Sequence, residues 1–207
     1  MTISDELALD LALLAAAETG GQAYARTWVA ADHAVVVGRG TRIEHEVDVD
    51  YCRRTGLKLV RRPSGGGAVV VGPGTLQWTL ALPYALGSEL ESIAGAKHWA
   101  NALLLGALGR RSLSADESGD LVLDNRKAGG LALKRGRRAV LVHGTILCTA
   151  DLDTIDAALR HPPREPSYRR GRSHHDFLVN LGAIDAEVLE RRLQASLVAL
   201  RALPARH

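Results

Sequence analysis

The sequence predicts an α+β fold in which a mixed, largely antiparallel sheet is flanked by helices. Its apolar strand segments come in neighbouring pairs joined by short turns, as residues 127–133 and 139–148 do on either side of a basic turn. Amphipathic helical segments precede, separate and follow these pairs. Strands that alternated strictly with helices would favour a doubly wound parallel sheet instead, and this chain lacks that alternation.

The composition is that of a globular chain with a substantial core. Of the 207 residues, 46% are hydrophobic and 24% are charged, which excludes a disordered or fibrous protein. We expect a single domain over residues 1–207. Two cysteines are too few for a disulfide framework, and the acidic first residues do not suit a signal peptide. The uncharged run of residues 65–88 is broken by prolines. We therefore expect a cytoplasmic protein with no membrane partner.

The charge balance argues against a nucleic-acid partner. The net charge of +3 is small, and aromatic residues make up only 4% of the chain, so neither a strong basic field nor a stacking platform is expected. Only four of the 26 basic residues are lysines. The arginines at 135, 137, 138, 169, 170 and 172 could face an acidic partner, or could form an ordinary solvated surface.

In the first half of the chain, two helices enclose several strands. Asp5 and Glu6 suit the first turn of a helix over residues 5–19, which Gly20 ends. Ser88 and Glu91 form a capping box, which predicts a longer helix from residue 88 to residue 109. Between these helices we expect strands at 23–30, 34–38 and 57–61, a short helix at 47–54, and a hairpin of strands 68–71 and 76–82.

In the second half, a hairpin is followed by helices. A strand at 121–124 precedes the hairpin formed by residues 127–133 and 139–148. Asp151 caps a helix that reaches residue 160, and residues 161–172 form a loop rich in proline and arginine. The last helix begins at Asp185, and its apolar face carries Val188, Leu189, Leu193, Leu197 and Leu200.

The strongest local signal is the run Arg61-Arg62-Pro63-Ser64-Gly65-Gly66-Gly67 at the end of an apolar strand. Three successive glycines lack Cβ atoms, so a ligand can approach the backbone closely and receive hydrogen bonds from N–H groups. The adjacent arginines can pair with a carboxylate or phosphate. The run is not a P-loop, because no Gly-Lys-Ser/Thr sequence follows it. A flexible surface loop is the alternative interpretation.

A second signal lies around Lys127. Strand alternation places Lys127, Gly129 and Leu131 on one face, so the lysine has open space beside a bare glycine. Its amine could hold an oxygen on which negative charge develops. A solvated lysine near a turn is the equally weighted alternative.

A third signal is His143-Gly144-Thr145, which alternation places on a face shared with Leu141 and Leu147. The histidine suits either a satisfied core residue or a site residue. Other possible sites are weaker. Adjacent side chains at His174, His175 and Asp176 point to different sides, which disfavours a metal site. Cys52 and Cys148 are expected to be small buried residues and not nucleophiles.

Taken in order, these segments resemble the lipoate–protein ligase A family within the wider biotin/lipoyl ligase group. The resemblance covers most of the chain. It runs through residues 5–10, Trp28, residues 35–39, the arginine–serine–triple-glycine run, residues 126–130, residues 143–147 and Asn180-Leu181. The combination of the triple glycine, the lysine strand and the His-Gly-Thr strand is specific, whereas each motif alone is not.

The resemblance implies a catalytic core like those of class II synthetases and biotin ligases, and a two-step reaction. Lipoate would be activated by ATP to lipoyl-AMP, with Mg²⁺ on the triphosphate and no metal ligand assigned to the protein. A lysine of an acceptor lipoyl domain, in a 2-oxoacid dehydrogenase complex or the glycine cleavage H protein, would then take the acyl group. Lys127 would be the catalytic residue. Substrate and adenylate would be bound by Arg61, Arg62, Ser64, Gly65, Gly66, Gly67, Gly129, His143, Gly144 and Thr145.

The sequence departs from the family pattern at several points. Many members carry an additional C-terminal domain, which we do not expect within these 207 residues. Two consequences stay open: a separate accessory protein could replace that domain, or the chain could only transfer the acyl group from preformed lipoyl-adenylate. Gly119 stands where the family often has asparagine, and residues 70–74 lack the usual aromatic and His-Asp pair. Two alternatives stay open: an octanoyl or lipoyl transferase of the same fold without ATP, and a non-catalytic subunit that binds acyl-carrier domains. A biotin ligase is disfavoured, because its arginine-glycine loop is missing.

Overall fold

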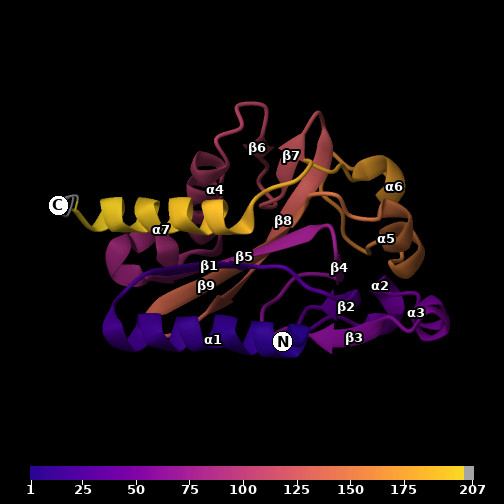
Figure 1. Cartoon of the computed structure of the whole chain (residues 1–207), viewed down its shortest axis with the longest axis horizontal. Coiled ribbons are helices and arrows are strands. Elements are labelled where there is room, and N and C mark those ends of the chain that lie inside the picture. Colours follow the sequence, from indigo (N-terminus) through magenta and orange to yellow (C-terminus); the bar gives the residue numbers. More distant parts are fainter. Residues whose placement is uncertain (203–207) are drawn as a thin grey trace.

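The structure is a computed structural model that describes residues 1–202. Its largest element is a six-stranded sheet in which every neighbouring pair is antiparallel, and helices pack on both of its faces (Figure 1). In spatial order its strands are β1 (Tyr24–Trp28), β5 (Thr75–Pro83), β9 (Ala139–Leu147), β8 (Arg126–Arg135), β7 (Leu121–Leu123) and β6 (Ser114–Ala115). The predicted α+β class with a largely antiparallel sheet is confirmed.

A second sheet of three strands packs beside the first. Its order is β3 (Lys58–Arg61), β2 (Ala34–Val37) and β4 (Val69–Val71). The central strand β2 pairs in parallel with β3 and antiparallel with β4. A parallel pair needs a crossover connection, which α2 (Ile43–Glu46) and α3 (Val49–Thr55) provide. All four residues of β2 are buried, as its uninterrupted apolar sequence requires.

Helices cover the two faces of the large sheet. On one face, α1 (Ile3–Gly20) packs Leu14 and Ala17 against β5 and β9. On the other, α4 (Ile93–Leu108) and α7 (Ala186–Ala202) enclose the main core. The remaining helices are α5 (Leu152–Ala158), α6 (His174–Phe177) and the 3₁₀ turns η1 (Tyr84–Leu86) and η2 (Ser88–Glu91). In the described residues, no helix combines the length and apolar character needed to cross a bilayer.

The predicted hairpin of residues 68–71 and 76–82 is wrong. The first segment belongs to the small sheet, where β4 pairs with β2, and the second is β5 of the large sheet, which pairs with β1 and β9. Between them the chain turns at Gly72–Gly74, where Gly74 has a φ of +82°. Its carbonyl accepts hydrogen bonds from the N–H groups of Cys148 and Thr149. Alternation of apolar residues reveals a strand but not its partner, and both segments are buried.

Short elements account for the other differences. Residues 88–91 form a 3₁₀ turn, and α4 begins at Ile93 because the Ser92 side chain accepts from the Gly95 N–H at 2.9 Å. The predicted capping box therefore lies one turn too early. The two-residue strand β6 and the four-residue helices α2 and α6 were not predicted, since such lengths carry no measurable periodicity. The hairpin of β8 and β9 and the three long helices are confirmed.

Candidate active site

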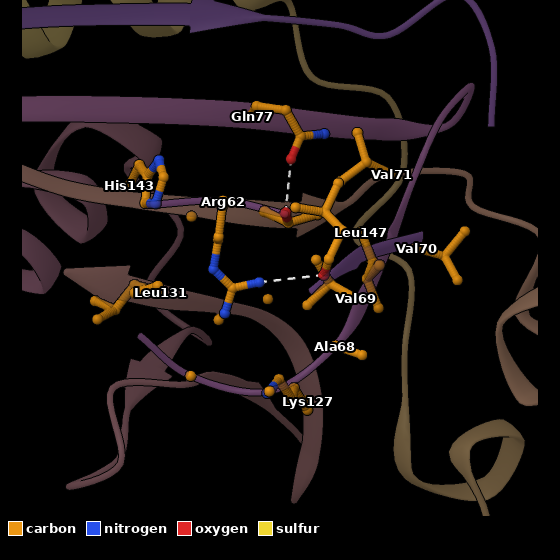
Figure 2. Close-up of a pocket in the computed structure, with 18 of the residues that line it drawn as sticks. Arg62, Ala68, Val69, Val70, Val71, Gln77, Lys127, Leu131, His143 and Leu147 are labelled. Atoms are coloured by element: carbon orange, nitrogen blue, oxygen red, sulfur yellow. Dashed lines mark hydrogen bonds between the residues drawn. The ribbon is translucent and has the colours of Figure 1, made fainter. Parts of the chain in front are cut away.

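A cavity of about 280 Å³ lies on the α1 side of the large sheet, bounded by the small sheet and the triple-glycine loop. Figure 2 shows Arg62, Gln77, Lys127 and His143 around this space. One group of lining residues is apolar and comes from α1, β1, β2 and β4: Leu7, Trp28, Val36 and Val71. Another is basic and comes from the segment of residues 160–173, namely Arg164 and Arg169, and the His174 side chain lies next to it. An elongated ligand with an apolar part and an anionic part fits such a lining.

Lys127 contributes an amine to the cavity. Its Nζ atom lies 2.7 Å from Oδ1 of Asp120, and the lysine side chain is 30% exposed against 9% for the aspartate. A Cβ atom built on Gly130 would lie 3.0 Å from this Nζ. The bare glycine at position 130 therefore makes the space that the amine occupies.

The expectation that Lys127 shares its face with Gly129 is wrong. The pairing of β7 with β8 shifts between Leu121 and Val122, so that Leu121 pairs with Gly129 and Val122 with Lys127. The extra residue on β8, Ala128, is a β-bulge, which breaks the alternation and brings the lysine to the face of Gly130. Gly129 has another role, because a Cβ there would lie 2.6 Å from the Thr145 carbonyl oxygen.

The triple-glycine loop leaves room for side chains of the protein itself. A Cβ on Gly66 would lie 2.8 Å from the Arg62 guanidinium, and one on Gly67 would lie 2.5 Å from a carboxylate oxygen of Glu46. Arg62 is buried and donates to the carbonyl oxygens of Val36 and Gly65. Burial lowers the pKa of Arg62 to about 10, and Glu46 opposes that shift. The guanidinium thus stays charged near neutral pH and holds the loop in place.

A buried chain of hydrogen bonds links this loop to α1. Oγ of Ser64 lies 2.6 Å from Nε2 of His143, and Nδ1 of His143 lies 3.0 Å from Oδ2 of Asp10. The carboxylate can only accept, so Nδ1 carries the hydrogen. Arg62 Nε donates to Ser64 Oγ at 3.1 Å, which leaves the serine hydroxyl free to donate to Nε2. Arg26 donates to the other oxygen of Asp10.

The segment of residues 160–173 lies against the cavity. Arg169 is only 4% exposed, and its Nη2 atom has no hydrogen-bond partner among residues 1–202. Burial lowers the pKa of this guanidinium. An orphaned cationic donor beside a cavity suits an anionic ligand. The expectation that Arg169 belongs to a solvated or partner-facing surface is wrong, because Phe177 lies under its guanidinium carbon at 5.0 Å from the ring centroid.

Most of the residues singled out in the sequence meet at the cavity, and three do not. Those that line it are Arg62, Gly66, Gly67, Lys127, Gly129, His143, Gly144 and Thr145. Arg61 points elsewhere and donates to the carbonyl oxygens of Gly38, Arg39 and Thr41. Ser64 and Gly65 do not line the cavity, and the Ser64 side chain is buried.

Sequence reasoning missed several residues of the site. Asp10, Glu46, Asp120 and Arg169 are brought to it from distant elements. Asp10 occupies a helix position that periodicity would assign to the apolar face, and it is 1% exposed. A buried carboxylate at such a position is a signal that could have identified it, because buried charges are normally paired.

The class of protein to which this fold and cavity belong is given by the comparison with known families. Residues 2–193 match the model of the lipoyl protein ligase A/B catalytic domain. The chain therefore belongs to the lipoyl protein ligase A/B catalytic domain family.

Individual relatives share only part of their length with this chain. A protein of Aeropyrum pernix named as a lipoate-protein ligase A is 32% identical over 151 residues, which cover 72% of this chain and 55% of the relative. Lipoate-protein ligase A subunit 1 of Thermoplasma acidophilum is 27% identical over 159 residues, covering 72% and 60%. Mouse mitochondrial lipoyl amidotransferase LIPT1 is 30% identical over 129 residues, covering 62% and 34%. The matched region thus spans about a third to three fifths of these relatives.

Solved structures share the fold. A Thermoplasma acidophilum lipoate protein ligase with bound lipoic acid superposes with a TM-score of 0.73 at 22% identity, covering 97% of this chain and 81% of that chain. A lipoate-protein ligase A bound with ATP has a TM-score of 0.73 at 23% identity, with the same coverage. These likenesses establish the mixed α+β architecture.

Proposed function

We propose that this chain is a lipoate–protein ligase that activates lipoate with ATP and transfers the lipoyl group to a lysine of an acceptor lipoyl domain. In the first step, a carboxylate oxygen of lipoate attacks the α-phosphorus of ATP, and pyrophosphate leaves with the electron pair of the broken bond. In the second step, the neutral ε-amine of the acceptor attacks the carbonyl carbon of the mixed anhydride. AMP leaves, and the amine loses a proton to solvent.

The observation that carries the proposal is the position of the Lys127 amine in one cavity with the triple-glycine loop. A lysine there can hold a carboxylate oxygen and an α-phosphate oxygen together while charge redistributes between them. Neither step requires a protein nucleophile, so positioning and charge stabilisation suffice. The apolar lining around Leu7 and Trp28 suits an acyl chain. This acyl chain would lie along the strand that contains His143, Gly144 and Thr145.

The basic lining supports a nucleotide as the second substrate. Arg169, with its unpartnered Nη2, and Arg164 lie on the segment next to the cavity, and guanidinium groups bind phosphate oxygens strongly. The ATP-bound lipoate-protein ligase A has the same fold. We propose that Mg²⁺ enters with the triphosphate, whose oxygens it prefers, and helps to neutralise the leaving pyrophosphate.

The test incubates the purified chain with ATP, Mg²⁺, lipoate and an acceptor lipoyl domain, and reads the mass of the acceptor. The expected result is an acceptor heavier by one lipoyl group, formed only when ATP is present. A parallel assay measures lipoate-dependent exchange of labelled pyrophosphate into ATP without the acceptor. Exchange without transfer would assign the second step to a partner. Absence of both reactions would reject the proposal for the isolated chain.

A second candidate is acyl transfer without ATP, which the similarity to lipoyl amidotransferase LIPT1 favours. It predicts acceptor modification from a preformed lipoyl or octanoyl donor in the absence of ATP. A transferase that forms a thioester needs an accessible cysteine. Both cysteines are buried, neither lines the cavity, and burial raises the pKa of the Cys148 thiol. These observations favour the ligase.

The partners proposed for this chain are an acceptor lipoyl domain, from a 2-oxoacid dehydrogenase complex or a glycine cleavage H protein, and a separate accessory subunit. The Thermoplasma acidophilum relative is named as subunit 1, and a similar structure is described as a bi-partite lipoate protein ligase with its E2 lipoyl domain. A non-catalytic role in binding acyl-carrier domains would be indicated if the chain bound the acceptor but failed both assays above.

A further inference from the structure

The amine of Lys127 is oriented by a partner that is itself held from another part of the chain. A lysine stem has several rotatable bonds, so an amine at its end needs a fixed neighbour to keep one position. That neighbour is Asp120, whose Oδ1 lies 2.7 Å from Nζ. Asp120 follows the turn after β6, where its own N–H donates to Oδ1 of Asp116 at 2.8 Å.

The second oxygen of Asp120 is bound by a residue from a distant part of the sequence. The hydroxyl of Tyr168 donates to Oδ2 of Asp120 at 3.1 Å, across 48 residues of sequence. Asp120 thus accepts from Tyr168 with one oxygen while the other faces Lys127. Burial is the largest cause that raises the pKa of Tyr168, and Asp120 adds to it. The phenol is therefore protonated over the whole physiological range and can donate.

Tyr168 belongs to the segment of residues 160–173, which is bonded to the rest of the chain at both ends, through Arg160 to Glu44 and Glu46 and through Arg172 to Asn125. Its ring lies 5.0 Å from that of Phe177. Arg172 Nη2 donates at 2.8 Å both to the Tyr168 carbonyl and to the Asn125 carbonyl in the β7–β8 turn. Arg170 and Gly171 adopt positive φ values of 53° and 71°. The same segment carries Arg164 and Arg169 along the cavity.

From these contacts we propose that Tyr168 is a positioning residue, which orients the Lys127 amine through Asp120 when the segment of residues 160–173 is seated beside the cavity. The proposal rests on the proposed function for its consequence in catalysis. Seating of the segment then does two things together: it presents the arginines to an anionic ligand, and it aligns the amine. Activation of lipoate is thereby coupled to binding of the anionic ligand at the basic end of the cavity.

The decisive variant is Tyr168→Phe, which keeps the ring against Phe177 and removes only the donor. We expect kcat of lipoate-dependent pyrophosphate exchange to fall about tenfold, as the loss of a hydrogen bond to a charged group implies. KM for lipoate and for ATP should stay within about twofold, because the segment remains seated. The matched control is Tyr84→Phe, which removes a half-buried phenol that donates to the Gly136 carbonyl at 3.2 Å, away from the cavity.

Two further measurements separate positioning from a structural effect. In an Asp120→Asn background, Tyr168→Phe should cause little additional loss, because both changes break the same chain of contacts. Trypsin cleavage after Arg169, Arg170 and Arg172 should be as slow in Tyr168→Phe as in the parent. A raised KM for ATP with unchanged kcat, or rapid cleavage in this segment, would mean that Tyr168 only holds the segment and would overturn the proposal.

A measurement independent of catalysis uses the small number of lysines. The chain has four, Lys58, Lys97, Lys127 and Lys134, so acetylation by an N-hydroxysuccinimide ester can be followed at each by mass spectrometry. Tyr168→Phe should change the acetylation rate of Lys127 by about threefold, in either direction, and leave the rates of the other three lysines unchanged. An unchanged rate at Lys127 would overturn the proposal. If the parent chain shows no pyrophosphate exchange, the proposed function fails, while the acetylation result still decides the role of Tyr168.

Discussion

The Nε2 atom of His143 lies 2.6 Å from the Oγ atom of Ser64, which precedes it by 79 residues. This contact joins the central strand β9 to the triple-glycine loop. Asp10 holds the other ring nitrogen, and Arg26 in turn donates to Asp10. The loop is therefore anchored through a buried polar chain to α1, and the shape of the cavity depends on that chain.

Ser64→Ala should lower the free energy of unfolding by about 1–2 kcal/mol, because it leaves the buried Nε2 of His143 without its partner. Urea denaturation followed by circular dichroism measures this. Ser196→Ala on the exposed face of α7 removes a hydroxyl that only contacts the Arg192 carbonyl, and it should change stability by less than about 0.5 kcal/mol. Equal effects of the two substitutions would show that the buried contact contributes nothing.

Lys127→Ala should abolish lipoyl-adenylate formation without unfolding the chain, since the amine faces the cavity and is 30% exposed. Pyrophosphate exchange measures the activity, and thermal melting checks the fold. Lys134→Ala is the control, as this lysine lies on the same strand but does not line the cavity. Pyrophosphate exchange that persists in Lys127→Ala would remove the lysine from the mechanism.

Gly130→Ala should fold but lose most adenylation activity. Its Cβ would lie 3.0 Å from Lys127 Nζ and 3.1 Å from Asp120 Oδ1, so the flexible lysine must give way. Gly106→Ala in α4 meets no atom within 4 Å and should stabilise the chain by about 0.5–1 kcal/mol with activity unchanged. Initial rates of exchange and melting temperatures, measured side by side, check both outcomes. Full activity in Gly130→Ala would mean that the amine does not need this space.

Cys148→Ala should leave acyl transfer intact. The thiol is buried in the main core, and burial raises its pKa, so little thiolate forms near neutral pH. Mass spectrometry of the acceptor domain measures the transfer, with and without ATP. A variant that stays folded but transfers nothing would instead favour the cysteine route of a transferase.

Acid should destabilise the chain in part through His174. Burial, followed by Arg169, lowers the pKa of this histidine from 6.5 to about 4, with His161 and Lys127 acting in the same direction and Asp156 opposing them. Between these two pH values the unfolded chain binds a proton that the folded chain does not, so stability declines as pH falls. His174→Gln should therefore show a shallower loss of melting temperature from pH 7 to pH 4.5. Parallel curves for parent and variant would contradict this.

The sequence was sufficient to predict the strand-forming segments, the long helices and the motifs of the site, because each has a local pattern. Which strands pair with one another was harder to predict. The segments that became β4 and β5 looked like a hairpin, yet they lie in different sheets, because apolar alternation does not encode the identity of a neighbour.

For the site, too, the residues in local motifs could be predicted, and the contacts between distant residues could not. Arg62, Lys127 and the glycines were predicted from their local motifs, and all of them except Gly65 line one cavity. The strand face on which the Lys127 side chain lies was not predicted correctly, since a single bulged residue in β8 reverses the alternation. Asp120 acts through Lys127, seven residues further along the chain, and Asp10 acts through His143, 133 residues further along, whereas Arg169 stands out by its burial. Such contacts arise from tertiary packing and leave no local pattern.

The three-residue turn at Gly72–Gly74 joins the last strand of the small sheet directly to a central strand of the large one. So short a covalent tether keeps these two walls of the cavity at a nearly constant separation. Widening of the chamber to admit or release a bulky molecule is therefore expected at a border that this tether does not span, such as the one lined by Arg164 and Arg169. Entry and exit rates should then respond to changes at that border and be almost insensitive to changes near the tether.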